Sequence, residues 1–300
     1  MKRLLPALAA VLLGISATQA QPGQDGLAFL KHGVGARAIA MGEAYTAAAS
    51  DPAATYYNPA SLVTSPSSQI LLMHKEWMAD TRTEFLAAKA GFDDFALALS
   101  VNATSVSDIE IRETPGPALG TFDSRNAAIG LSAAYRIDPT VGIGITAKYL
   151  YEKILTAEAH GTGIDLGGWY MTPWDLRLAA AIGNLGSMEE LDREATVLPS
   201  MVRAGATYET PIEAVDGGLT LAADFVSLSH ESKSHLHMGA ELNYKKTLMI
   251  RAGYQTGYET QAFSTGLGVR YEMFAVDYAF APMKIDFGST HTFSLLIDFP

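Results

Sequence analysis

The residues of this sequence that could do chemistry are ionisable side chains at alternate positions of short repeating segments. In each segment one set of positions is apolar, and the intervening set holds Gly, Ala, Ser or Thr with an occasional charged residue. Charged groups on a face shielded from bulk water must be paired or hydrated. They would therefore line a path for an ion or ligand, or form ion pairs with a segment packed against them. The candidates for such a lining are Lys148, Arg177, Arg203, Asp224, Glu241, Arg251, Arg270 and Asp277.

No arrangement typical of an enzyme stands out. The sequence contains no G-x-S-x-G nucleophile elbow, no H-E-x-x-H zinc motif, no Walker loop and no cysteine. His235 and His237 would share one face of a strand, and an acidic run lies between Met188 and Glu194. Solvated turns carry such residues more often than metal sites do. We therefore expect a protein that is not an enzyme and that has no catalytic residue, metal or cofactor.

The elements that must position these side chains are predicted to be β-strands. From about Ser68 to the C-terminus, apolar residues alternate with small or polar ones, and turn residues interrupt the pattern about every 8 to 15 positions. Between Val141 and Tyr151, for example, the odd positions are apolar and Gly, Thr and Lys lie among the even ones. The pattern predicts about 14 strands, beginning near residues 68, 82, 94, 121, 140, 158, 175, 199, 217, 233, 247, 261, 273 and 289.

A transmembrane antiparallel β-barrel over residues 68–300 explains this pattern better than a soluble β-sandwich does. A sandwich would carry solvated Lys, Glu and Thr opposite its apolar face, whereas here the opposite face is mostly small, which suits a narrow or plugged lumen. Aromatic residues gather at strand ends, where barrels carry their interfacial girdles. An even number of strands of roughly ten residues also lets the sheet close without a free edge.

The two ends of the chain are typical of an exported membrane protein. Residues 1–20 read as a signal peptide, with Lys2 and Arg3 before an apolar stretch and a cleavage site before Gln21. The final alternating strand places Phe299 next to the chain end. This arrangement resembles the C-terminal signal that directs outer-membrane barrels to the barrel assembly machinery. We therefore expect a location in the bacterial outer membrane, with that machinery and membrane lipid as partners.

Composition excludes other classes of protein. The chain has 300 residues and a mean hydropathy of +0.12, and no apolar run after residue 20 approaches the roughly 20 residues of a membrane-spanning helix. Its net charge is −11 and its Lys and Arg residues do not cluster, which argues against a nucleic-acid partner. The absence of cysteine excludes a disulfide framework and a thiolate metal site.

Residues 21–67 break the alternation and are rich in Gly and Ala. It contains a G-x-R-A-x-A-M-G run, then Asp-Pro, then Y-x-N-P-A-x-L, carried by Gly35, Arg37, Ala38, Ala40, Met41, Gly42, Ala44, Asp51, Tyr57, Asn58, Pro59, Ala60 and Leu62. This pattern resembles the N-terminal signature of the PorV/PorQ family, which belongs to the wider FadL-like group of outer-membrane transport proteins. Where that family commonly has Gly-Gly-Ala and Asn-Pro-Ala-Gly, this chain has Gly42-Glu43-Ala44 and Asn58-Pro59-Ala60-Ser61.

The resemblance implies a 14-stranded barrel with residues 21–67 folded inside it as a hatch. Pro59 fixes its own φ and restricts Asn58 to extended conformations, and the Asn58 side chain can cap nearby backbone amides. A rigid turn at this point would anchor the hatch. Arg37, inside the signature, is the natural partner for one of the lumen carboxylates.

The resemblance also implies a role in type IX protein secretion or surface attachment, with secretion-system proteins as partners. The alternatives are FadL-like passive transport of hydrophobic small molecules such as long-chain fatty acids, and a structural barrel that scaffolds other envelope proteins. About 20 residues are available for each strand and its connection, which predicts short extracellular loops. A barrel that receives secreted cargo would be expected to carry larger loops.

Overall fold

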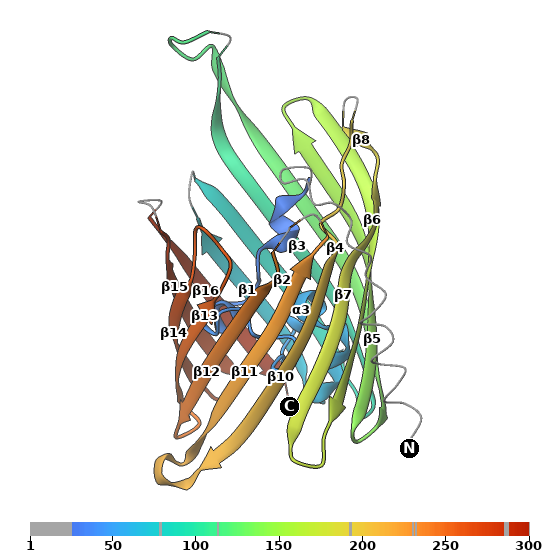
Figure 1. Cartoon of the computed structure of the whole chain (residues 1–300), viewed down its shortest axis with the longest axis vertical. Coiled ribbons are helices and arrows are strands. Elements are labelled where there is room, and N and C mark those ends of the chain that lie inside the picture. The colour runs from blue at the N-terminus through green and yellow to red at the C-terminus, as the bar shows by residue number, and fades with distance from the viewer. Residues whose placement is uncertain are drawn as a thin grey trace.

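Fourteen strands of the described chain form a closed antiparallel barrel (Figure 1). The computed structural model describes residues 26–77, 80–112, 114–191, 194–229, 231, 233–284 and 288–299. The predicted signal peptide lies outside these residues. Strands β8 (Glu190–Leu191) and β9 (Glu194–Ala195) pair with each other in a connection. The barrel strands are β1 (Ser68–Glu76), β2 (Thr81–Gly91), β3 (Phe95–Ile111), β4 (Gly120–Asp138), β5 (Val141–Ile154), β6 (Ala157–Met171), β7 (Leu176–Met188), β10 (Met201–Ile212), β11 (Gly217–Leu228), β12 (His235–Tyr244), β13 (Leu248–Gln255), β14 (Phe263–Tyr271), β15 (Phe274–Pro282) and β16 (Ser289–Phe299).

The barrel closes where the first strand meets the last. Strand β1 runs antiparallel to β16, with Ser68 opposite Phe299 at one end and Glu76 opposite His291 at the other. A sheet that closes on itself leaves no edge of unpaired backbone N–H and C=O groups, each of which costs several kcal/mol in lipid. The closure confirms the predicted all-β barrel of about 14 strands.

The outer face carries the apolar belt that the alternation predicts. Leu131 is 62% exposed and Leu267 53% exposed, whereas their neighbours along the strands face inward and are buried. So large an apolar surface marks contact with a membrane rather than with water. A closed barrel with such a belt is the architecture of bacterial outer-membrane proteins, and the expected location therefore holds. Among the described residues, no helix is long and apolar enough to cross a membrane.

The connections differ in length between the two ends of the barrel. The end that holds Ser68 and Phe299 has short turns, such as 139–140 and 272–273, whereas the opposite end has connections such as 189–200 and 256–262. In outer-membrane barrels the periplasmic turns are short and the extracellular loops longer. The end with Ser68 is therefore the periplasmic end, and the hairpins at the other end face the outside of the cell.

Two strands are much longer than the sequence predicts. Strand β3 has 17 residues and β4 has 19, and they stay paired out to Ile111 opposite Gly120. Their hairpin projects well beyond the other strands at the extracellular end (Figure 1). The spare chain that a loop would use is therefore held in a two-stranded ribbon, because each strand can satisfy its backbone against the other even in water.

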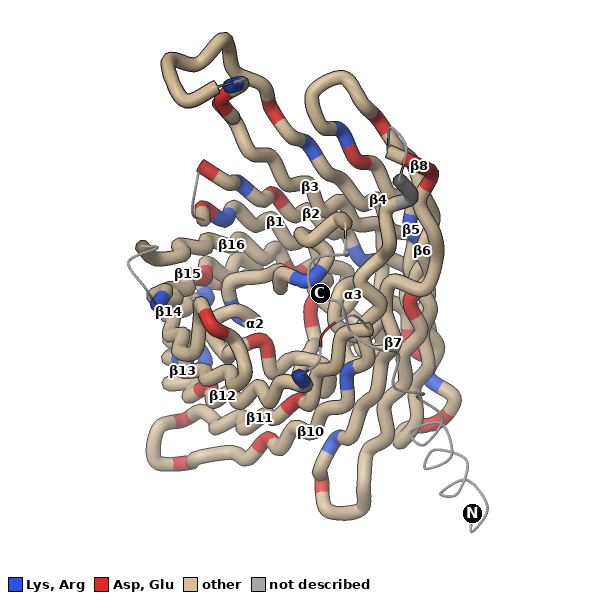
Figure 2. The backbone as a smooth tube through the Cα atoms, turned by 45° about the horizontal axis from the view of Figure 1, so that its top comes forward, with Lys and Arg blue, Asp and Glu red and all other residues tan. Residues whose placement is uncertain are grey.

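Residues 26–67 fill the lumen (Figure 2). Their core side chains, including Val34, Met41, Tyr45 and Leu62, have no exposed surface. The Ala residues of this hatch pack closely against small residues of the wall, so that backbone approaches backbone. Its helices are short, namely η1 (Ala28–Lys31), α2 (Ala36–Ala40), α3 (Ala54–Tyr57) and η2 (Pro59–Thr64).

Closure can be tested with a pair of cysteines, because the native chain has none. Leu72 of β1 lies opposite Leu295 of β16, and directly opposed residues place their Cβ atoms about 4.5–5.5 Å apart. We expect Leu72→Cys with Leu295→Cys to form a disulfide on mild oxidation, seen as a change in gel mobility that reductant reverses. The control pairs Leu72→Cys with Phe299→Cys, four residues out of register and roughly 13 Å away along the strand. Equal cross-linking of both pairs would contradict this closure.

Candidate functional site

Two glycines of the N-terminal signature set the ends of helix α2. Gly35 precedes it with a φ of 83° and Gly42 follows it with a φ of 63°, both in the left-handed region that favours glycine. Between them, Ala38 is buried and its carbonyl accepts hydrogen bonds from the N–H groups of Met41 and Glu43. The chain therefore makes one tight helical turn and then reverses along the wall.

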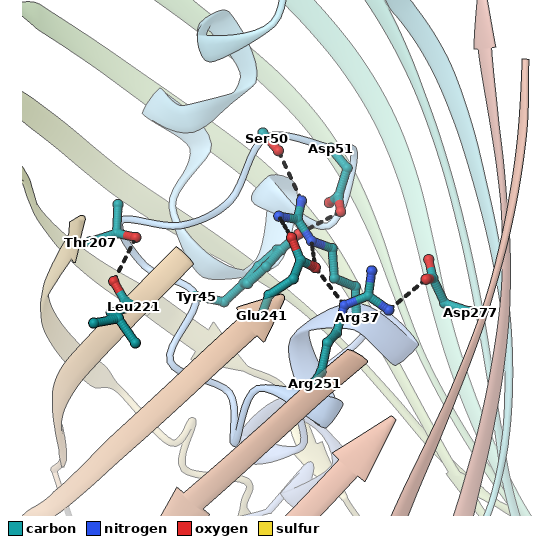
Figure 3. Close-up of polar contacts among 9 residues, drawn as sticks. All are labelled: Arg37, Tyr45, Ser50, Asp51, Thr207, Leu221, Glu241, Arg251 and Asp277. Carbon is teal, nitrogen blue, oxygen red and sulfur yellow. Dashed lines mark hydrogen bonds and ion pairs between the residues drawn. The ribbon is translucent and has the colours of Figure 1, made fainter. Parts of the chain in front are cut away.

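Arg37 of α2 joins the hatch to the wall at one carboxylate. Its Nε and Nη2 atoms donate to Oε2 and Oε1 of Glu241 on β12, each at 2.8 Å, and Nη1 donates to Ser50 Oγ at 3.0 Å (Figure 3). Burial by itself lowers the pKa of Arg37, but the carboxylate of Glu241 outweighs burial and raises this pKa, so the guanidinium stays charged. The expectation that Arg37 pairs with a lumen carboxylate is confirmed.

The pair extends into a network of four charged side chains, three of which are buried. Arg251 of β13 donates from Nε to Glu241 and from Nη1 to Asp277 Oδ1 of β15, the latter at 2.6 Å. Two guanidinium groups and two carboxylates thus neutralise one another across three wall strands and the hatch (Figure 3). We call Arg37, Glu241, Arg251 and Asp277 the ion network.

Asp224 of β11 holds the next part of the hatch through its backbone. Its Oδ2 atom accepts hydrogen bonds from the N–H groups of Tyr45 at 2.9 Å and Thr46 at 2.8 Å. The Tyr45 hydroxyl in turn donates to Oδ2 of Asp51 at 2.6 Å, and Asp51 Oδ1 accepts from the N–H of Ala53. The signature residue Asp51 therefore orders the turn before α3, within the hatch.

The Asn-Pro-Ala turn is rigid in the way the sequence predicts. Asn58 is extended and caps η2, since its Oδ1 accepts from the N–H of Ala60 at 3.1 Å with Pro59 in the first turn. The Asn58 side chain also donates to the carbonyls of Thr46 and Gly168, and Trp169 Nε1 donates to the Ala60 carbonyl at 2.9 Å. The turn is thereby fixed to β6.

Glycines of the wall allow the hatch backbone to approach the wall closely, and we call these positions the glycine seats. A Cβ atom on Gly253 would lie 1.9 Å from the backbone nitrogen of Gly42, and one on Gly239 would lie 2.4 Å from the Met41 carbonyl oxygen. Gly144 makes the same close approach to the backbone of Ala60. No other residue fits at such distances, which explains the many glycines on the lumen face.

The other predicted lumen residues make contacts of different kinds, some to the hatch and some within the wall. Lys148 pairs with Asp165 of β6 at 2.7 Å, and Arg177 donates to the Ala47 carbonyl at 3.1 Å. Arg203 is buried beside Tyr57 and lies 4.0 Å from the Glu43 carboxylate. Arg270 is the exception, since it lies exposed at the periplasmic rim, 3.5 Å from Asp298.

Sequence reasoning missed an apolar cluster in the extracellular half of the lumen. The signal that could have revealed it is Leu150, a large apolar residue at a lumen-facing position of β5. Side chains from η1 pack there against apolar residues of β4 to β7 and of the connection before β10. We call this set the mouth cluster; it consists of Leu27, Phe29, Leu30, Ala128, Leu150, Ala159, Met188 and Leu198.

A small polar cavity of about 20 Å³ lies directly beneath the mouth cluster. Leu30 forms part of its lining, and polar groups on the other sides come from Tyr57, Lys148, Asp165 and Arg203. In the part of the chain that the structure describes, no three His, Asp or Glu side chains gather closely enough to hold a metal ion.

The ion network should fail when its central carboxylate is neutralised. Glu241→Gln leaves the buried Arg251 and the partly exposed Arg37 without this counter-charge, and breaking a buried pair costs roughly 3–5 kcal/mol. We expect a lower midpoint in urea unfolding and faster proteolytic cleavage within 26–67. Arg125→Gln removes an exposed pair with Asp123 and should change neither measurement. Equal behaviour of the two variants would contradict the anchoring role.

The glycine seats make a second, steric prediction. Gly253→Ala would push its Cβ into the Gly42 backbone, so we expect the hatch to be displaced and its residues to become susceptible to protease. Gly163→Ala is the matched control, because its Cβ would meet its nearest neighbour at 3.7 Å, an ordinary contact. Limited proteolysis of both variants in lipid checks this. Protection of the hatch in Gly253→Ala would show that the contact is not required.

Comparisons with known proteins find likeness in fold alone. No protein-family model matches the chain, and no curated protein matches it either. Among solved structures, the CymD monoaromatic hydrocarbon channel is 14% identical with a TM-score of 0.61, over 92% of this chain and 98% of that one. The Pseudomonas putida toluene transporter TodX is 13% identical with a TM-score of 0.61, over 94% of this chain and 99% of that one. The chain therefore shares the barrel fold of these two outer-membrane channels along nearly its whole length.

Proposed function

We propose that the protein is a passive conduit for small hydrophobic molecules across the outer membrane. The observation that carries the proposal is the mouth cluster, an apolar region at the extracellular end of the lumen that is separate from the larger apolar core around the rest of the hatch. An apolar chamber with a few placed polar groups is the usual form of a small-molecule site. In this protein the wall residues of the mouth cluster enclose such a space, which we call the chamber. Leu27, Phe29 and Leu30 of the hatch occupy it.

The shared fold supports this reading over a role in secretion. CymD is named as a monoaromatic hydrocarbon channel and TodX as a toluene transporter. Both have this barrel along nearly the whole length of the chain. A hydrophobic small molecule is therefore the class of ligand that we propose for the mouth cluster.

Helix η1 is the part of the hatch best suited to give way. It has only four residues, and Leu27 before it has a left-handed φ of 49° and no side-chain cap. Its contacts to the rest of the chain include Gly26 N–H to the Val197 carbonyl at 3.1 Å and a partly buried ion pair between Lys31 and Glu231 at 3.2 Å. The ion network, by contrast, is joined to the wall by charge-assisted hydrogen bonds, and three of its four members are buried. A ligand could thus displace η1 while the rest of the hatch stays anchored.

A bulge in the wall offers an exit beside the chamber. The ladder between β6 and β7 shifts register between Ile164 and Leu166, and Asn184 adopts a left-handed φ of 60°. The Asn184 N–H donates to the carboxylate of Asp165 at 2.7 Å instead of to a strand carbonyl. Because a side chain replaces a backbone hydrogen bond there, β6 and β7 can separate more easily at this point than two regularly paired strands. We propose this point as the route by which ligand enters the membrane.

Uptake by cells tests the conduit. Cells that carry the full chain in the outer membrane should take up ¹⁴C-toluene faster than cells with the vector alone. Ala128→Trp fills the chamber and should abolish the gain, whereas Ala127→Trp, on the lipid face of the same strand, should not. Deleting residues 26–31 removes η1 and its side chains from the chamber and should raise the uptake rate severalfold. A rate that follows none of these changes would refute the conduit.

A second candidate is a barrel of the PorV/PorQ type that serves type IX secretion or surface attachment as a scaffold. The specific observation in its favour is the projecting β3–β4 ribbon, which offers a surface outside the membrane (Figure 1). In that case uptake would be unchanged in every variant, and removal of the ribbon between 107 and 121 would impair surface display of secreted proteins.

A further inference from the structure

The polar cavity beneath the mouth cluster contains two buried side chains whose polar atoms have no protein partner. Arg203 is 3% exposed and its Nη1 atom has no hydrogen-bond acceptor. Tyr57 is 1% exposed and its hydroxyl is likewise unpartnered. Both residues line the cavity, with Leu30 of η1 on another side. A guest that enters from the extracellular end would reach this cavity, and we call the Arg203 and Tyr57 side chains that line it the floor.

Leaving these groups unpaired is costly, which points to a guest that carries a polar atom. A buried donor without an acceptor loses the full free energy of its desolvation, and the loss is larger for a charged group. The nearest carboxylate to Arg203 is that of Glu43, at 4.0 Å from Nη2, which is beyond hydrogen-bonding distance. The rings of Tyr57 and Tyr56 lie 5.1 and 5.6 Å from the guanidinium carbon, and the Tyr56 hydroxyl, which donates to the Leu30 carbonyl, still leaves Nη1 without an acceptor.

The charges around the cavity decide which polar atom fits. Lys148 is neutralised by Asp165 at 2.7 Å. Arg203 lies 4.0 Å from the Glu43 carboxylate and also interacts electrostatically with Asp224, whose Oδ1 atom is itself unpartnered. The surroundings of the cavity therefore contain more negative than positive charge. A guest with a carboxylate would add a third negative group near Arg203, whereas a neutral group would not.

The Tyr57 hydroxyl can either donate a hydrogen bond to a neutral guest or accept one from it. Burial, and then the nearby Glu43 carboxylate, raise the pKa of Tyr57, so the hydroxyl keeps its proton at physiological pH. A phenol hydroxyl can donate one hydrogen bond and accept others. Arg203 can only donate. The floor as a whole thus matches a head group that both accepts and donates a hydrogen bond.

We propose that the chamber is selective for neutral amphipathic molecules that carry a hydroxyl head group, such as alcohols and phenols, over both hydrocarbons and carboxylates. This proposal rests on the proposed conduit function and names its ligand class. The hydroxyl oxygen accepts from Arg203 Nη1, and its hydrogen is donated to the Tyr57 oxygen. The apolar remainder takes the place of the η1 side chains in the mouth cluster. A hydrocarbon leaves both floor groups unpaired.

Equilibrium dialysis with three ligands of equal length tests the selectivity. The full chain in lipid nanodiscs is dialysed at pH 7 against ¹⁴C-labelled octane, 1-octanol or octanoate, and the uptake of empty nanodiscs is subtracted. We expect 1-octanol to bind about tenfold more tightly than octane, which corresponds to one hydrogen bond to a charged group, and more tightly still than octanoate.

Variants locate the effect. Tyr57→Phe should reduce the ratio of octanol to octane affinity about tenfold, because the head group loses its acceptor. Tyr278→Phe removes a hydroxyl that lies against His291 on the lipid side of the wall and should leave the ratio unchanged. If Tyr57→Phe fails to fold, Arg203→Lys replaces it, since a lysine ammonium keeps the charge but changes the donor geometry.

The possible outcomes separate this proposal from the function on which it rests. Binding of none of the three ligands would remove the conduit itself. Binding of octanoate at least as tightly as octanol, or of octane equally tightly, would overturn the hydroxyl selectivity and leave the conduit standing. A preference for octanol that Tyr57→Phe does not reduce would also overturn it, because the floor would then not be its source.

Discussion

The hatch backbone lies inside the barrel, where bulk water does not supply its hydrogen bonds, so the wall has to supply them. Asp224 takes two N–H groups, Ser264 accepts from one and donates to a carbonyl, and Gln255 and Trp169 each donate to a carbonyl. Glycines between these side chains let the two backbones come close enough to use them. The lumen face therefore combines Gly with isolated polar residues because both are needed to hold one short segment of backbone.

The interior is held differently on its two sides. Toward β12, β13 and β15 the hatch is joined by the ion network, whose disruption costs roughly 3–5 kcal/mol because a charge is left unpaired. Toward β4 to β7, at the extracellular end, it is joined by the apolar mouth cluster. Burying a large apolar side chain stabilises the structure by about 1.5–3 kcal/mol, and any other apolar group that occupies the same place gives a similar stabilisation. The first contact is specific to its partners, and the second is exchangeable.

Much of the barrel could be predicted because each wall strand separates lipid from the lumen. Its side chains therefore alternate between apolar residues and small or polar ones. The predicted strand starts lie within two residues of those in the structure, as at Ser68, His235 and Ser289. That Arg37 would pair with a carboxylate followed from burial, but the choice of Glu241 required the position of α2 against β12. The mouth cluster could not be predicted, since Leu150 reads as an irregularity until Leu27 and Phe29 are placed opposite it. The lengths of β3 and β4 could not be predicted because the two strands stay paired beyond the membrane. Both faces meet water there, so the residue pattern does not mark where the strands end.

A filled lumen is compatible with the passage of apolar molecules in a way that it is not for ions. An ion needs a continuous hydrated path, because stripping its water costs far more than any contact returns. An apolar molecule loses little on leaving one apolar surface for another, and so it can advance by replacing Leu30 and Phe29 without any water entering the mouth cluster. The chamber then never exists as an empty space. What remains to be satisfied at each exchange is the polar floor around Arg203, and for this reason the floor, rather than the apolar wall above it, can discriminate between ligands of the same size.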